Sequence, residues 1–243
     1  MHVTGLRRVM GIVRAMTLKL VVLLPLVCCA AFSQGTTPPP IVRILSTGGP
    51  NRPGYADTTV DVIGLTATTG APQTWWIEMH PSFASIEDHG SSSGYLGNDS
   101  RAMIGVLQPG WSYLPEEAVR SLPRARYVRV TVYRIRPGTE TDFARVAQYR
   151  KVASDKVTAG RADLFYHVVS GDDTGTYIAL SPLASMSALD DGAADPPPSA
   201  PAEVLAKEAE IEISREHYLF RVEPRLSHVS GDFANGDPHF WRP

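Results

Sequence analysis

Alternation of hydrophobic and polar positions recurs along this chain and predicts a protein built mainly from β-strands. The best-formed stretch is Tyr127–Ile135, where Val128, Val130 and Val132 alternate with polar or aromatic residues, a period of two that is typical of strands. A Pro-Gly turn, an amphipathic helix and a second strand follow, giving a βαβ unit over 127–169. The second strand of this unit is Leu164–Val169, and further strands are predicted at Ile41–Leu45, Val60–Thr68, Thr74–His80, Ala102–Gln108, Thr176–Leu180 and Tyr218–Glu223.

Apolar residues at helical spacing predict helices between some of these strands. The first main helix begins at Thr139 or Thr141 and ends at Gly160, and one face carries Phe143, Val146, Ala147, Ala153 and Val157. A second is predicted at Ala202–Glu216, where Leu205, Ala209 and Ile213 would be buried and Glu203 would pair with Lys207. Shorter helices are predicted at Ser82–His89 and Pro115–Ser121, with loops at Gly90–Ser100 and Asp190–Pro201.

Two pairs of segments repeat in the same order, which indicates an internal duplication. Val106–Ser112 matches Arg221–Ser227 in an aliphatic residue, a proline and a serine at identical spacing. Thr74–Pro81 matches Gly175–Pro182, and a small-residue segment follows each. The alternative is a chance similarity between strands that both end in proline.

The repeat predicts an α+β fold of two tandem ferredoxin-like units. Residues 127–230 form a complete βαββαβ unit, whereas 41–115 form a degenerate unit whose first helix is lost and whose second is shortened. A connector, 116–126, joins them, and a polar and aromatic tail covers 231–243. One such unit leaves a sheet face bare, so we expect the two to pack sheet to sheet.

The first 33 residues have the pattern of a signal peptide, and 34–40 that of a stiff linker. The only charges there are Arg7, Arg8, Arg14 and Lys19, ahead of an apolar run at Leu20–Ala31. That run of about a dozen residues is shorter than a spanning helix needs, which disfavours a retained anchor. Two further interpretations of the segment are a lipoprotein modified at Cys29 and initiation at Met16. We therefore expect export to the periplasm or outside the cell, with no stable membrane span after cleavage.

Composition excludes several kinds of chemistry for the exported form. Both cysteines, Cys28 and Cys29, lie in the signal segment, so no disulfide or cysteine-bound zinc is expected. Removing four cations from 23 Lys+Arg against 25 Asp+Glu leaves a net charge of about −6, which disfavours nucleic-acid partners. No histidine pair has i, i+4 spacing and there is no G-x-S-x-G motif, so no metal, cofactor or serine nucleophile is predicted.

Strand alternation also suggests where a ligand would bind. If Val128, Val130 and Val132 face the helices, the polar set on the other face lines the space between the sheets. The candidate ligand-binding residues are Arg129, Tyr133, His167, Arg221, Glu223, Glu78 and His80. The alternative is that these side chains simply pair with one another, as Arg221 with Glu223 or Arg129 with Glu78, and fill the interior.

The sequence resembles the dimeric α/β-barrel superfamily, and within it a group of uncharacterised exported bacterial proteins with a tandem arrangement. The resemblance is carried by Tyr127–Phe143, Gly175–Pro182 and the ending Asp232–Pro243, and it extends from Ile41 to the end. It implies two ferredoxin-like units packed sheet to sheet. Relatives include cofactor-free monooxygenases, haem-binding and haem-degrading enzymes, and units without known chemistry, so the resemblance leaves activity open.

The sequence thus favours an exported protein that binds a small, partly apolar molecule between its two sheets. One alternative is a non-catalytic structural or interaction module with a filled core. A second, by analogy of fold, is a cofactor-free monooxygenase-like or haem-binding enzyme, and a third is a metal-dependent enzyme, which would need a His/Glu cluster. The two units would form a pseudo-dimer within one chain, so a monomer would suffice.

Overall fold

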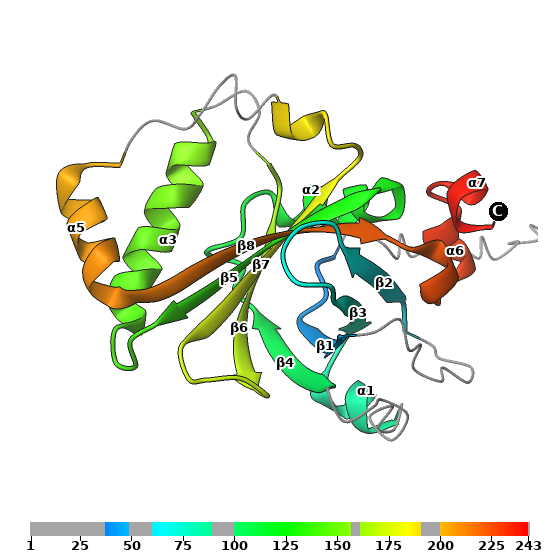
Figure 1. The fold of residues 1–243 in the computed structure, drawn as a ribbon, viewed down its shortest axis with the longest axis horizontal. Helices are drawn as coiled ribbons and strands as arrows, with labels where there is room; N and C mark the ends of the chain where they lie inside the picture. The colour runs from blue at the N-terminus through cyan, green and yellow to red at the C-terminus, as the bar shows by residue number, and fades with distance from the viewer. Residues whose placement is uncertain (1–36, 49–59, 89–99, 157–160, 191–199, 243) are drawn as a thin grey trace, which may run out of the picture. The chain divides into compact units, whose positions relative to one another are not determined.

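A computed structural model describes residues 37–48, 60–88, 100–156, 161–190 and 200–242 (Figure 1). The predicted signal peptide lies outside these ranges, as do Val157, Gly160, most of the two predicted loops and the segment 49–59, where the first helix of a ferredoxin-like unit would stand. None of the helices in the described ranges combines the length and the apolar character that crossing a membrane requires.

Strands in the described ranges close into one antiparallel barrel in the order β1-β3-β2-β8-β5-β7-β6-β4. All seven strands predicted before β8 are present, with ends shifted by up to three residues. Their bounds are β1 Ile41–Thr47, β2 Val62–Ala67, β3 Thr74–His80, β4 Arg101–Leu107, β5 Tyr127–Ile135, β6 Leu164–Ser170, β7 Thr176–Leu183 and β8 Glu212–Val222.

The two halves of the chain contribute their strands in the same spatial order. β1 to β4 run β4-β1-β3-β2, and β5 to β8 run β8-β5-β7-β6, so each half has its fourth strand at one edge and its second at the other. The halves join by backbone pairing of β2 with β8 and of β4 with β6. They therefore form one closed barrel and do not stack as two separate sheets.

A buried serine reinforces each seam between the halves, with the same bonding on both sides. After β4, the Ser112 hydroxyl donates to the Gln108 carbonyl (3.0 Å) and accepts from the Phe165 amide (3.0 Å). After β8, the Ser227 hydroxyl donates to the Glu223 carbonyl (2.8 Å) and accepts from the Gly64 amide (2.9 Å). These two serines are the ones that the sequence repeat aligns.

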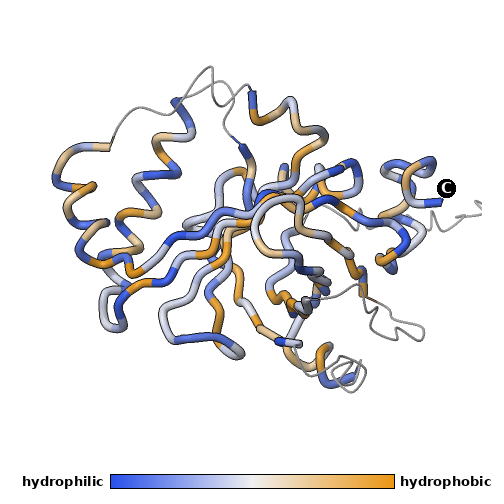
Figure 2. The backbone as a smooth tube through the Cα atoms, viewed as in Figure 1, coloured by the Kyte–Doolittle hydropathy of each residue, from blue (hydrophilic) through white to orange (hydrophobic). Residues whose placement is uncertain are grey.

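The barrel interior holds the aliphatic face of β5, which corrects the predicted assignment of faces. Val128, Val130 and Val132 belong to the interior cluster together with side chains from every other strand, whereas Tyr133 packs outside. The interior cluster also includes the rings of Trp75, Tyr166 and Phe220, so side-chain size does not by itself decide which face is inside. Figure 2 shows the alternation of hydrophobic and hydrophilic positions along these strands.

Helices α3 (Glu140–Ser154) and α5 (Ala202–Ile211) lie beside one another outside the barrel, at the left of Figure 1. Four of the five residues predicted on the α3 face, Phe143, Val146, Ala147 and Ala153, are buried, and the first two pack against rings of β5 to β7. Glu140 and Asp142 occupy the first turn, where carboxylates favour a helix N-terminus.

The second main helix is shorter than predicted, because its last predicted turn is strand. β8 begins at Glu212 and pairs with β5 from there onward. The hydrophobic pattern of this segment fits a helix or a strand, and pairing with the long neighbouring strand makes it a strand. Leu205 and Ile213 are 50% and 60% exposed, not buried, and Ala209 is exposed too. Lys207 pairs with Glu210 at 2.8 Å and with Asp142 at 3.6 Å, not with Glu203 as predicted.

One end of the barrel is closed by short helices, which we call the plug. It comprises α2 (Pro115–Ser121), η2 (Leu122–Arg124), α6 (Gly231–Ala234) and α7 (Pro238–Trp241). Leu122, Ala234 and Trp241 join the interior cluster, so the tail is packed structure. Two further short helices in the described ranges are α1 (Phe83–Asp88), at the position predicted, and η3 (Pro224–Leu226).

Candidate functional site

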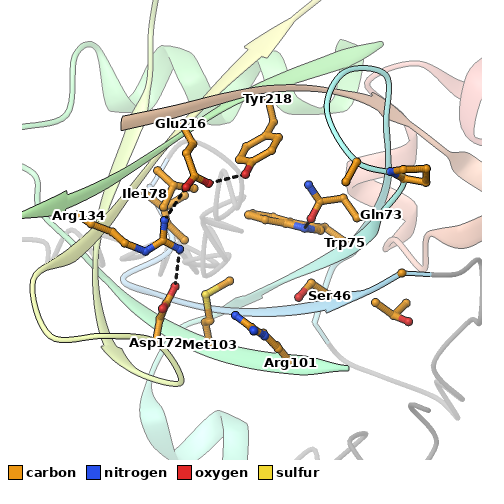
Figure 3. Close-up of a pocket in the computed structure, with 15 residues that line it drawn as sticks. Ser46, Gln73, Trp75, Arg101, Met103, Arg134, Asp172, Ile178, Glu216 and Tyr218 are labelled. Atoms are coloured by element: carbon orange, nitrogen blue, oxygen red, sulfur yellow. Dashed lines mark hydrogen bonds and ion pairs between the residues drawn. The ribbon is translucent and has the colours of Figure 1, made fainter. Parts of the chain in front are cut away.

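The opposite end of the barrel holds an open cavity of about 420 Å³, which we call the mouth (Figure 3). Its volume lies within the range of small-molecule sites, roughly 300–1,000 Å³. Trp75, Met103, Val132 and Ile178 reach it from the barrel interior. The other lining residues are Ser46, Thr47, Gly48, Ala71, Pro72, Gln73, Arg101, Arg134, Asp172, Glu216 and Tyr218.

The mouth is polar because the interior-facing series of several strands ends in a polar residue at this end. On β5 the series Val128, Val130, Val132 continues to Arg134, and on β8 Val222 and Phe220 continue to Tyr218 and Glu216. Strand pairing brings these ends together, since Val132 lies opposite both Ile178 and Glu216. One continuous face thus changes from apolar to polar along the barrel axis.

A charged network forms one side of the mouth. Arg134 donates through Nη1 to Glu216 Oε1 at 3.0 Å and through Nη2 to Asp172 Oδ2 at 3.4 Å. Asp172 stands in the turn after β6, where Gly171 has a φ of 93° and a Cβ would lie 1.9 Å from the Ala102 carbonyl oxygen. Only glycine fits there, so the turn that places Asp172 is fixed by the sequence.

Tyr218 completes the network and links it to the aromatic side of the mouth. Its hydroxyl donates to Glu216, and burial together with that carboxylate raises the pKa of Tyr218 to about 12. The phenol therefore stays protonated at neutral pH. Its ring lies 6.5 Å from that of Trp75, whose indole N–H donates to Gln73 Oε1 at 2.9 Å. Figure 3 shows these rings across the cavity from Asp172.

Arg101 is the cation of the mouth that remains without a carboxylate partner among the described residues. It starts β4, is exposed, and lies next to Met103 on the interior-facing series. In Figure 3 its guanidinium lies at the edge of the cavity below Trp75. Arg134 is neutralised by Glu216 and Asp172, so Arg101 supplies the charge that a ligand would meet.

The predicted ligand-binding residues lie outside the barrel interior, in three separate places. Arg221 and Glu223 are on the outer surface, where they pair with each other (2.6 Å) and Thr66 donates to Glu223 (2.8 Å). The predicted pairing of these two is thus present, but away from any cavity. The predicted pairing of Arg129 with Glu78 is wrong, because Glu78 bonds to Arg43 and His80.

Glu78 and His80 belong to a buried polar cluster on the outer side of β1 and β3. His80 Nδ1 lies 3.1 Å from Ser85 Oγ, and His80 Nε2 lies 3.2 Å from Glu78 Oε2. Burial raises the pKa of Glu78, but hydrogen bonds from His80 and Arg43 outweigh it and hold that pKa below the usual value. Serine, histidine and carboxylate are the parts of a nucleophilic triad, yet all three are at most 8% exposed, so a substrate has no access.

Tyr133, His167 and Arg129 lie on the helix-covered side of the barrel. Tyr133 packs beneath Arg150, whose guanidinium carbon is 4.8 Å from the ring centre. His167 stacks on Tyr177 with ring centres 4.7 Å apart. Arg129 has a buried Nε without a hydrogen-bond partner among the described residues. The seven predicted residues therefore do not form one site.

Metal ligands do not converge in the described ranges, which contain no group of three or more His, Cys, Asp or Glu side chains able to hold an ion. The family resemblance in the sequence leaves haem binding open, so the donor groups of the mouth bear on it. Among the described residues that line the mouth there is no histidine, the usual proximal ligand of haem iron in globins and peroxidases. The donor set of the mouth therefore does not fit a histidine-ligated haem.

No family model and no curated protein matches this sequence. Among solved structures it is similar to an anthrone oxidase-like protein at 11% identity and a TM-score of 0.52, covering 81% of this chain and 96% of that one. A second is a monooxygenase candidate from Lactobacillus acidophilus NCFM, at 11% identity and a TM-score of 0.47, covering 75% of this chain and 93% of that one. A third is a mutant chlorite dismutase from Candidatus Nitrospira defluvii in complex with cyanide, at 11% identity and a TM-score of 0.46, covering 78% of this chain and 93% of that one. The first likeness shows the fold alone: the chain has a dimeric α/β-barrel fold.

The residues of the mouth were missed because the faces were assigned the wrong way round. Once Val128, Val130 and Val132 are placed inside, alternation points to Arg134, and the same rule gives Arg101 from Met103. Glu216 was hidden by the helix predicted through it. The sequence pattern that could have identified these residues is a polar residue at the end of a series of alternate, otherwise apolar positions in a strand.

Proposed function

We propose that this protein is exported and that its mouth binds a small, partly apolar molecule without a metal or cofactor. The supporting observation is the mouth itself: an open cavity of about 420 Å³ where apolar side chains from four strands meet a fixed polar network. A barrel that served only as a structural or interaction module would not need this space, since its plugged end is filled. The export half of the proposal rests on the signal pattern of the first 33 residues.

We also infer that the chain is a tandem pair of ferredoxin-like units, residues 41–115 and 127–230, forming a pseudo-dimer. Support comes from the identical strand order of the halves and from the equivalent bonds of Ser112 and Ser227. The barrel is complete within one chain, so the proposed binding needs no second subunit.

Native mass spectrometry of protein purified from the periplasm tests binding and export together. We expect a retained small molecule, or capture of one from an aromatic-compound library. Ile178→Trp should abolish ligand binding by filling the mouth. Val152→Trp is the control and should leave binding unchanged, because Val152 lies on α3 and is 49% exposed. A protein that retains nothing and captures nothing would favour the structural module. An absorbance scan for a haem band checks the cofactor expectation on the same sample.

A second candidate is oxidation of an aromatic compound by oxygen in the mouth. It is favoured by the aromatic wall of Trp75 and Tyr218 together with the fold shared with the anthrone oxidase-like protein. Oxygen uptake on adding anthrone, lost in Ile178→Trp, would support it. Binding without oxygen uptake would leave the protein as a binding protein.

A further inference from the structure

We infer that the ligand of the mouth is a planar aromatic anion, such as an aromatic carboxylate, whose charge is bound by Arg101. This inference rests on the proposed function and specifies its ligand class.

The way in which the charges of the mouth pair favours an anion over a cation. The mouth contains two arginines and two carboxylates, but Asp172 and Glu216 both bond to Arg134, and Glu216 also accepts from Tyr218. A cationic ligand would have to compete with Arg134 for these carboxylates. Arg101 has no such competitor within the described part of the chain, and a guanidinium binds a carboxylate through two parallel hydrogen bonds.

The walls favour an aromatic ring attached to that charge. Trp75 and Tyr218 present rings to the cavity, and Met103 adds a polarisable thioether, which makes favourable contacts with aromatic rings. Met103 lies two residues after Arg101 on the same face of β4. A ring over Met103 and Trp75 would therefore place its carboxylate beside Arg101 at the rim.

Position on the rim also sets the expected size of the effect. Arg101 is exposed, so its attraction is screened by water and salt and should decide selectivity more than total affinity. The apolar walls would supply most of the binding and Arg101 the preference for an anion.

Isothermal titration of the purified protein with naphthalene-2-carboxylate and with the neutral naphthalene-2-carboxamide tests this. We expect the wild type to bind the carboxylate roughly tenfold more tightly, with the preference falling as salt is raised. Arg101→Gln should make the two affinities equal. Arg145→Gln should keep the preference, because Arg145 is 78% exposed on α3 and away from the mouth.

The outcomes separate this inference from the proposed function. Equal affinities in the wild type, or a preference that survives Arg101→Gln, would overturn the anion inference and leave the binding site standing. Failure of both compounds to bind would overturn the two together. Unchanged thermal unfolding of both variants shows that any lost preference is a property of the site.

Discussion

The two ends of the barrel are made by the same eight strands, yet one is a packed core and the other a cavity. At the plugged end Leu122, Leu164 and Leu180 leave a gap of only about 10 Å³. At the mouth the interior series ends in charged and hydroxyl groups around about 420 Å³. A single β-framework can thus combine a packed end and an open end along one axis, so substitutions at the two ends should have different consequences.

The largest expected loss of stability comes from opening the plugged end. Trp241 is 8% exposed, and its indole N–H donates to the Pro123 carbonyl at 2.7 Å. Trp241→Ala should lower the free energy of unfolding by about 3–5 kcal/mol, the usual cost of removing a buried tryptophan. Urea unfolding followed by circular dichroism measures this. Leu205→Ala, at a 50% exposed position on α5, is the control and should cost little; similar losses in both would mean that the tail is not a plug.

The sequence predicts those features of the two ends that depend on residues close together in the chain, and it does not predict those that depend on contacts between distant segments. The strands and α3 follow from alternation and helical spacing, and the dimeric α/β-barrel fold was expected from the family resemblance. The inner and outer faces do not, because both are apolar: valines fill the barrel while Tyr133, Phe165 and Tyr177 pack under α3. The wrong assignment of the two faces is the reason that the residues of the mouth were not predicted. The start of β8 was likewise set by pairing with β5, a contact distant in sequence.

A second prediction compares neighbouring interior positions of β7. Leu180 borders the small gap and Ile178 borders the mouth. Leu180→Trp should lower the free energy of unfolding by about 1–3 kcal/mol through overpacking, whereas Ile178→Trp should cost less because its ring has the cavity to enter. Thermal and urea unfolding of both variants provide the comparison. Equal costs would indicate that the mouth is not an open space in solution.

The smallest expected changes in the free energy of unfolding come from serine-to-alanine substitutions. These substitutions compare the two seams with each other and the plugged end with the mouth. Ser112→Ala and Ser227→Ala each remove the hydroxyl that accepts from a backbone amide at the plugged end, that of Phe165 or of Gly64, whereas the Gln108 and Glu223 carbonyls keep backbone donors. Each should lower the free energy of unfolding by about 1–2 kcal/mol, the cost of unsatisfied buried polar groups. Ser46→Ala at the rim of the mouth should change it by less than about 0.5 kcal/mol, as surface substitutions generally do.

Equal costs for Ser112→Ala and Ser227→Ala, measured by urea unfolding, would extend the equivalence of the two halves from geometry to energetics. A cost at one seam alone would show that the halves have diverged in what holds them together, although their strand order is the same. A cost for Ser46→Ala as large as for the other two would contradict the division of the barrel into a stabilising end and a binding end. The serine shared by the two matching segments is therefore also the most direct probe of how the two halves of the barrel are joined.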